Sequence, residues 1–163
     1  MTHRTNGDRM PEGKGSGIMD DYHNHARLRV IGDVHGHRTK YLKLVQEANE
    51  QDLYTLQLGD FGFSYEYNRL LDDKNFDVYM NKMFMGNHDC YTMAGDLERA
   101  GFCLGDYGSK TLNGVSFFFV RGAFSIDRQF RRIGVDWFPE EELPQSRFQE
   151  VVDAYLACKP DIM

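Results

Sequence analysis

The chain has 163 residues, 41% of them hydrophobic, with a formal net charge of −6 and a pI of about 5.5. This acidic balance argues against a protein that binds nucleic acid through a broad basic surface, because phosphate contacts need clustered Lys and Arg. The chain contains no apolar run near the roughly 18 residues of a membrane span and no apolar signal core. We therefore expect a cytoplasmic protein with no membrane partner.

Residues 1–26 are polar and rich in glycine, and we expect them to form a flexible N-terminal arm. His23 and His25 in this arm could bind a metal, but an unordered segment cannot hold ligand geometry. Residues 27–163 are expected to form one domain. Its three cysteines, Cys90, Cys103 and Cys158, are widely spaced and odd in number, which predicts free thiols in a reducing compartment.

The first half of this domain alternates between short apolar runs and helical patterns. Residues 28–33, 53–60 and 81–89 are strand candidates that each end in a glycine followed by polar residues. A helix is predicted over residues 41–50, and a partly helical stretch surrounds Tyr67. This strand–helix–strand order predicts a parallel sheet and therefore an α/β fold.

The second half begins with a predicted short helix over residues 93–101, which Gly101 closes. The strongest strand pattern lies in residues 114–124, with Gly114 in the turn before it. An amphipathic helix is predicted over residues 147–160, where Pro160 prevents its continuation. The last three residues of the chain look like the start of another strand.

Three polar clusters follow the three strand candidates of the first half. They contain Asp33, His35 and His37 after the first strand, Asp60 after the second, and Asn87, His88 and Asp89 after the third. Asp33 and Asp60 are 27 positions apart, and so are Asp60 and Asn87. Because the carboxyl ends of parallel strands meet at one edge, we expect the clusters to lie together. Each motif alone is more often a turn or a cap, but their common order and spacing make coincidence improbable.

Carboxylate, imidazole and amide groups form an oxygen and nitrogen ligand set that suits Mn²⁺, Fe, Zn²⁺ or Mg²⁺. Asp33 and His35, two positions apart on an extended strand end, would project to the same side and hold one ion. A carboxylate on the neighbouring strand could bridge two ions. The bridging water would become hydroxide near neutral pH and attack phosphorus. A histidine on the opposite side could protonate the leaving oxygen or hold a phosphate oxygen.

The ordered motifs Asp-x-His, Gly-Asp and Gly-Asn-His-Asp resemble the signature of the calcineurin-like metallophosphoesterases. The segments GAFSIDRQFR and WFPEEEL resemble bacterial and phage members, and the resemblance runs from about residue 28 to the end. It implies an αββα sandwich with two divalent metal ions, for which we expect Mn²⁺ first. By match of motif, the metal ligands would be Asp33, His35, the bridging Asp60 and Asn87. The catalytic residues would be His88, beside the leaving group, and Asp89, which would orient a neighbour.

The family pattern also contains late ligands, a histidine after a further strand and then a Gly-His-x-His motif. No histidine of this chain follows His88. In family members a sequence like the final KPDIM leads into the strand that carries the first of these histidines. We therefore expect a sandwich that is incomplete at the C-terminus, with an exposed apolar edge, low stability or self-association.

We accordingly predict a hydrolase acting on a small phosphomonoester, phosphodiester or nucleotide, whose exact substrate the sequence does not reveal. An alternative is a truncated, catalytically inactive homologue that binds metal or nucleotide. A Rossmann-type nucleotide binder is weaker, because Gly-x-Gly-x-x-Gly is absent after the first strand.

Two weaker features lie in the second half of the domain. One is the charged segment with Arg121, Asp127, Arg128, Arg131 and Arg132, which is either a loop that holds substrate phosphate or a solvated connector. The other is Trp137-Phe138, which is expected to anchor this loop to the core rather than to stack on a base. His37, near a predicted helix start, is expected to be a cap or surface residue.

Overall fold

The computed structural model describes residues 28–62 and 64–163. The expected arm over residues 1–26, with His23 and His25, lies outside the described residues. In the described part, each strand candidate of the first half forms a strand, and the segment between each pair of strands contains a helix.

The first half forms a parallel sheet in the order β1-β2-β3. Strand β1 is Leu28–Ile31, β2 is Tyr54–Gln57 and β3 is Asn81–Met83. Helix α1, Arg38–Asn49, connects β1 to β2, and helix α2, Ser64–Leu71, lies between β2 and β3. Both pairings are parallel, so all three strands point their carboxyl ends to the same edge of the sheet.

The second half begins with helix α3, Ala94–Arg99, and continues into an antiparallel hairpin. The hairpin strands are β4, Tyr107–Leu112, and β5, Val115–Val120. Helix α4 is Phe148–Cys158, and the short 3-10 turns are Tyr91–Met93, Arg128–Phe130, Pro139–Glu141 and Gln145–Arg147. Near the end of the chain, Ile162 pairs with Phe117 of β5 in parallel, which agrees with the expected start of a strand.

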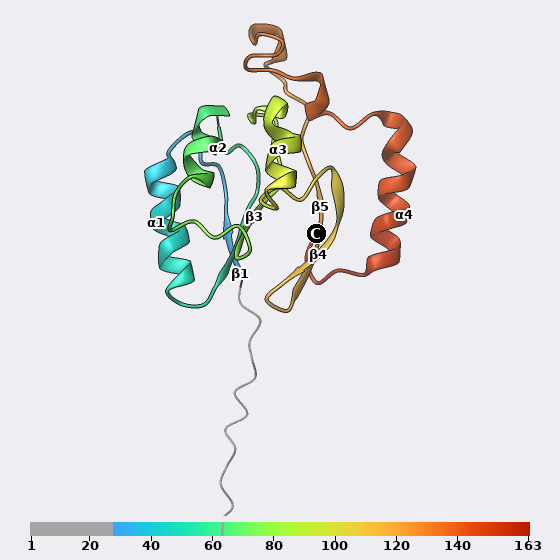
Figure 1. The fold of residues 1–163 in the computed structure, drawn as a ribbon. Helices are drawn as coiled ribbons and strands as arrows, with labels where there is room; N and C mark the ends of the chain where they lie inside the picture. Colours follow the sequence, from blue (N-terminus) through green and yellow to red (C-terminus); the bar gives the residue numbers. More distant parts are fainter. Residues whose placement is uncertain (1–27, 63) are drawn as a thin grey trace, which may run out of the picture.

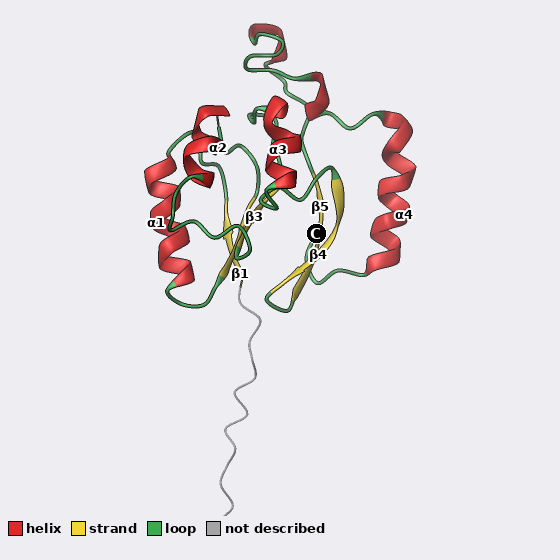
Figure 2. Ribbon diagram, in the orientation of Figure 1, coloured by secondary structure: helices red, strands yellow, loops and turns green. Residues whose placement is uncertain are grey.

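The elements are stacked in four layers (Figure 1). Helices α1 and α2 lie on one side of the parallel sheet, the β4–β5 hairpin lies on its other side, and α4 lies beyond the hairpin; Figure 2 shows the same order by type of element. One apolar cluster packs beneath the helices of the first half, and a second one, with Leu56, Phe117 and Phe119, joins the two sheets. The expected α/β sandwich is therefore confirmed.

Strand β4 was not predicted from the sequence. Its middle residues Gly108, Ser109 and Lys110 are weak strand formers, and the last two are exposed. The signal that could have located it is the Asn113-Gly114 pair before β5. Both residues have positive φ, 46° and 80°, as a two-residue hairpin turn requires.

Helix α4 agrees with the predicted amphipathic helix but has no fully buried side chain among the described residues. Phe148, Val152 and Leu156 follow one face of the helix and are 55%, 47% and 65% exposed. These exposed apolar side chains lie on a helix face, whereas the exposed apolar edge of the second sheet, low stability and self-association stay predictions.

The cysteines in the described part of the chain, Cys90, Cys103 and Cys158, are free thiols, and Cys103 is buried. Burial raises the pKa of the Cys103 thiol to about 11. No helix formed by residues 28–62 and 64–163 is long and apolar enough to cross a bilayer.

Candidate metal centre

The loops that follow β1, β2 and β3 are joined by hydrogen bonds at one edge of the parallel sheet. The backbone nitrogens of Val34 and His35 donate to the carbonyl oxygen of Asp60 at 3.0 and 2.9 Å. The backbone nitrogen of His88 donates to the Asp60 carboxylate oxygen Oδ1 at 3.0 Å. The second loop therefore holds both of its neighbours, and the three loops meet at one edge, as expected for consecutive parallel strands.

Glycine is required where the second and third loops cross. Gly59 has a φ of +90°, and a Cβ atom on it would lie 2.5 Å from the backbone nitrogen of Gly86. A Cβ atom on Gly86 would in turn overlap the Asp60 carboxylate. Side chains at these two positions would push the loops apart and displace Asp60.

We predict that Gly59→Ala destabilises the fold more than Gly101→Ala. Gly101 has a similar φ of +77° but no heavy atom within 4 Å of its ideal Cβ position. Gly101→Ala should lower the free energy of unfolding by roughly 1–2 kcal/mol, the cost of a left-handed conformation for an L residue. Gly59→Ala adds the clash with the backbone of Gly86, worth about 1–3 kcal/mol more. Urea unfolding measures both, and equal losses would contradict the close approach of the loops.

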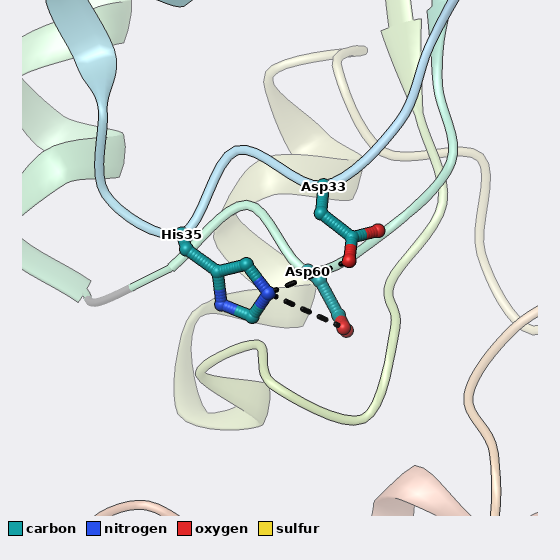
Figure 3. Close-up of side chains that lie close together, drawn as sticks. All are labelled: Asp33, His35 and Asp60. Carbon is teal, nitrogen blue, oxygen red and sulfur yellow. Dashed lines mark ion pairs between the residues drawn. The ribbon is translucent and has the colours of Figure 1, made fainter.

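Asp33, His35 and Asp60 form a compact group of possible metal ligands. One ligand atom of each lies within 4.8 Å of the other two. Figure 3 shows the His35 ring directed at both carboxylates, with its Nε2 3.5 Å from Asp33 Oδ2 and 4.0 Å from Asp60 Oδ2. The side chains of Asp33, His35 and Asp60 are 69%, 50% and 17% exposed. The group is therefore anchored at Asp60 and open to solvent at Asp33.

Two members of this group have a backbone conformation that is uncommon for residues other than glycine. The φ angle is +44° at His35 and +55° at Asp60. Such conformations cost roughly 1–3 kcal/mol and cluster at functional sites, where the surrounding structure holds them. The hydrogen bonds between the loops supply that support here.

His88 lies beside this group. Its ring and that of His35 have centroids 5.4 Å apart at an angle of 67°. Both rings line a cavity of about 300 Å³, to which Arg131, Asp136 and Phe138 also contribute. A ligand in the cavity can thus contact His35 of the Asp33–His35–Asp60 group and His88 at the same time.

Asn87 precedes His88 on the loop after β3. A residue distant in sequence binds its side chain. The amide nitrogen Nδ2 of Asn87 donates to the hydroxyl oxygen of Ser125 at 2.9 Å. The contact with Ser125 was not predicted, because 38 positions separate the two residues. No local sequence pattern signals such a contact.

Asp89 is buried and braces the loops. Its Oδ1 accepts hydrogen bonds from the backbone nitrogens of Phe61 and Gly62 and from the Tyr67 hydroxyl, at 2.7 to 3.0 Å, and its Oδ2 accepts one from Gly86. Burial raises the pKa of the Asp89 carboxyl, and the hydrogen bonds from Tyr67, Gly62 and Gly86 oppose that rise. This arrangement favours the supporting role expected for Asp89 over direct contact with a reacting group.

The arginines of the charged segment have different surroundings. Arg121 pairs with Asp106 at 2.9 Å, Arg128 with Glu142 at 3.1 Å and Arg132 with Asp136 at 3.2 Å. Arg131 lines the cavity beside His88, and its side chain is 9% exposed. The segment is thus neither wholly a solvated connector nor a cluster of arginines around the site.

Phe138 and His37 lie where the sequence analysis expected them, as a core anchor and as a cap or surface residue. Phe138 is buried and packs on Tyr91 with ring centroids 6.1 Å apart, so it anchors the loop to the core as expected. His37 is exposed at the N-cap position of α1. It makes no side-chain capping hydrogen bond in the described part of the chain.

A divalent cation fits the Asp33–His35–Asp60 group. Oxygen and nitrogen atoms that each lie about 2.0–2.2 Å from one ion such as Zn²⁺ are separated by roughly 3–4 Å. The 3.5 and 4.0 Å separations between His35 Nε2 and the two carboxylates fall in this range. Two carboxylates and one imidazole also suit Mn²⁺, Fe, Zn²⁺ and, less well, Mg²⁺.

Comparison with models of known protein families identifies the family of this chain. The family model for calcineurin-like phosphoesterases matches residues 26–157. Neither the search of curated proteins nor that of solved structures returned a significant match. Because the matched stretch covers most of the chain and contains all three polar loops, the protein belongs to the calcineurin-like phosphoesterase family.

Proposed function

We propose that this chain is a metal-dependent phosphoesterase that hydrolyses a phosphomonoester or phosphodiester by attack of water on phosphorus. The observation that supports this most directly is the Asp33–His35–Asp60 group, whose His35 lines one cavity together with His88. Membership of the family supports the reaction class.

In the proposed site, Asp33 and His35 would hold one ion, Asn87 would hold a second ion, and Asp60 would be a ligand to both. Two divalent ions are expected, with Mn²⁺ as the first choice and Fe, Zn²⁺ or Mg²⁺ as others that suit these ligands. When bound, such ions supply the positive charge that balances the phosphate and increase the acidity of water.

The residues around the ions perform the other steps. His88 protonates the leaving oxygen or holds a phosphate oxygen, because its ring lies next to that of His35 in the same cavity. Arg131 lines this cavity and offers a fixed positive charge to the phosphate. Asp89 keeps the loops that carry Asp60 and His88 in place.

The proposed substrate is a small phosphoester or a nucleotide. A cavity of about 300 Å³ lies at the lower limit of small-molecule sites, roughly 300–1,000 Å³. The net charge of −6 is compatible with such a substrate, since the ions supply positive charge locally. The proposed location is the cytoplasm, because its reducing conditions suit the free thiols of this chain.

The test is hydrolysis of an aryl phosphodiester and an aryl phosphomonoester by metal-stripped protein, with and without added Mn²⁺. We expect hydrolysis that depends on Mn²⁺ and ends when a chelator is added. Asp33→Ala, purified in the same way, controls for contaminating phosphatases and should lose the activity. If Mn²⁺ binds but neither ester is hydrolysed faster than by Asp33→Ala, the inactive metal- or nucleotide-binding homologue is the better description.

A further inference from the structure

Ser125 connects the candidate ligand Asn87 to Arg131. The Ser125 hydroxyl oxygen accepts a hydrogen bond from Asn87 Nδ2 at 2.9 Å and another from an Arg131 Nη1 nitrogen at 2.6 Å. Ser125 is 1% exposed, so water does not compete for these contacts. A serine hydroxyl can accept two hydrogen bonds and still donate one. The two donors therefore fix the position of this hydroxyl.

Arg131 also holds the main chain of Asn87. Its Nη2 nitrogen donates to the carbonyl oxygen of Asn87 at 2.8 Å. One guanidinium thus contacts both the backbone of Asn87 and the hydroxyl that binds the Asn87 side chain. The planar guanidinium fixes these two contacts relative to each other, which a single ammonium group would not do.

A buried carboxylate lies behind Arg131. Glu141 is 0% exposed, and its two carboxylate oxygens accept no hydrogen bond from the described residues. Arg131 Nη1 lies 3.8 Å from Glu141 Oε2, and Asp127 Oδ1 lies 3.6 Å from Nη1. A buried charge is costly unless it is paired. Glu141 therefore favours an arginine at position 131 and keeps its guanidinium in place.

The loop that carries these residues is pressed against the end of β3. The backbone nitrogen of Gly122 donates to the carbonyl oxygen of Met85 at 2.6 Å. A Cβ atom on Gly122 would overlap the carbonyl oxygen of Glu141. Both ends of the segment from residue 122 to residue 141 are thus fixed close to Asn87.

We infer that Ser125 and Arg131 are positioning residues for Asn87. The amide nitrogen of Asn87 is bound to Ser125, so the amide oxygen is the atom left to bind a cation. Without Ser125 the amide could rotate and present its nitrogen, which is not a metal ligand. This inference rests on the proposed function, in which Asn87 holds the second ion. Loss of such a supporting partner typically reduces metal affinity about 10–100-fold.

The test measures Mn²⁺ binding by calorimetry, which needs no catalytic activity. We expect Ser125→Ala to weaken binding at the Asn87 site about tenfold, the lower end of the range for such partners. Arg131→Met should weaken it at least as much, and Arg131→Lys should restore only part of the affinity. The control is Arg132→Met, next in the chain, whose side chain is 75% exposed and pairs with Asp136; it should leave binding unchanged.

A double-mutant cycle separates positioning from general support of the fold. In an Asn87→Ala background, Ser125→Ala should cause no further loss of Mn²⁺ affinity, because the group it positions is already gone. Urea unfolding without metal monitors the stability of each variant. If Arg131→Met does not fold, Arg131→Met with Glu141→Gln avoids leaving the buried carboxylate without its cation.

The outcomes distinguish this inference from the proposed function. Equal Mn²⁺ binding by wild type and Ser125→Ala, with weaker binding by Asn87→Ala, would overturn the positioning role and leave the phosphoesterase proposal standing. The same loss from Ser125→Ala with and without Asn87 would also overturn it. If the wild type binds no Mn²⁺, both proposals fail.

Discussion

Asp60→Asn is expected to remove more divalent-metal affinity than any other single substitution in this chain. The Asp60 carboxylate lies in reach of both Asp33 and His35 and is the least exposed of the three side chains. Two unit charges 4 Å apart interact by about 4 kcal/mol at an effective dielectric constant of about 20. Removing the charge of a bridging ligand should therefore lower Mn²⁺ affinity on the order of a hundredfold or more.

This substitution should leave the fold intact. Asparagine adopts positive φ more readily than most residues, so the +55° at position 60 is tolerated. The amide oxygen of Asn can still accept the hydrogen bond from the His88 backbone nitrogen. The loss of metal affinity should therefore reflect the missing charge.

Asp52→Asn is the matched control. Asp52 has a φ of +54°, almost that of Asp60, but is exposed in the turn after α1. The Asp52→Asn variant should bind Mn²⁺ as the wild type does. In urea without metal, Asp52→Asn and Asp60→Asn should both unfold close to the wild-type midpoint. Equal calorimetric binding by wild type and Asp60→Asn would rule out the bridging role of Asp60.

The part of the site that local patterns encode was predictable from the sequence. Apolar runs that end in Gly-Asp or Gly-Asn identify strands β1 to β3, and parallel strands must deliver Asp33, Asp60 and Asn87 to one edge. The same patterns predicted α1 and α4 to within a few residues. These features depend on neighbours in sequence, so they can be read without a structure.

The rest of the site depends on contacts between residues that are distant in sequence. The Ser125 hydroxyl is bound by Asn87, 38 positions earlier, and the Asp89 carboxylate by donors on the loop after β2 and on α2. Glu141 looks like one of several acidic residues in WFPEEEL, yet it is the one that is fully buried. Burial and pairing of this kind follow from how the loop packs, which no short motif specifies.

His88→Ala is expected to lower kcat by about 10²–10⁴-fold, the usual contribution of a positioned acid or base. Metal affinity should stay within about threefold of the wild type, since the backbone nitrogen that binds Asp60 is retained. The control is His37→Ala, which also removes an imidazole. His37 is exposed at the start of α1, so this variant should keep wild-type activity. Loss of activity in His37→Ala to the same extent would contradict the assignment.

The leaving group distinguishes the two roles proposed for His88. A nitrophenolate leaves without a proton, whereas a phenolate or alkoxide is far more basic and needs one from an acid. If His88 is the acid, His88→Ala should lower the rate of hydrolysis of the phenyl ester much more than that of the nitrophenyl ester. If His88 instead holds a phosphate oxygen, both esters should be slowed alike, because that contact does not depend on the leaving group. Full activity of His88→Ala on both esters would exclude either role, and the catalytic group would have to come from another residue of the cavity, with Arg131 and Asp136 the first to test.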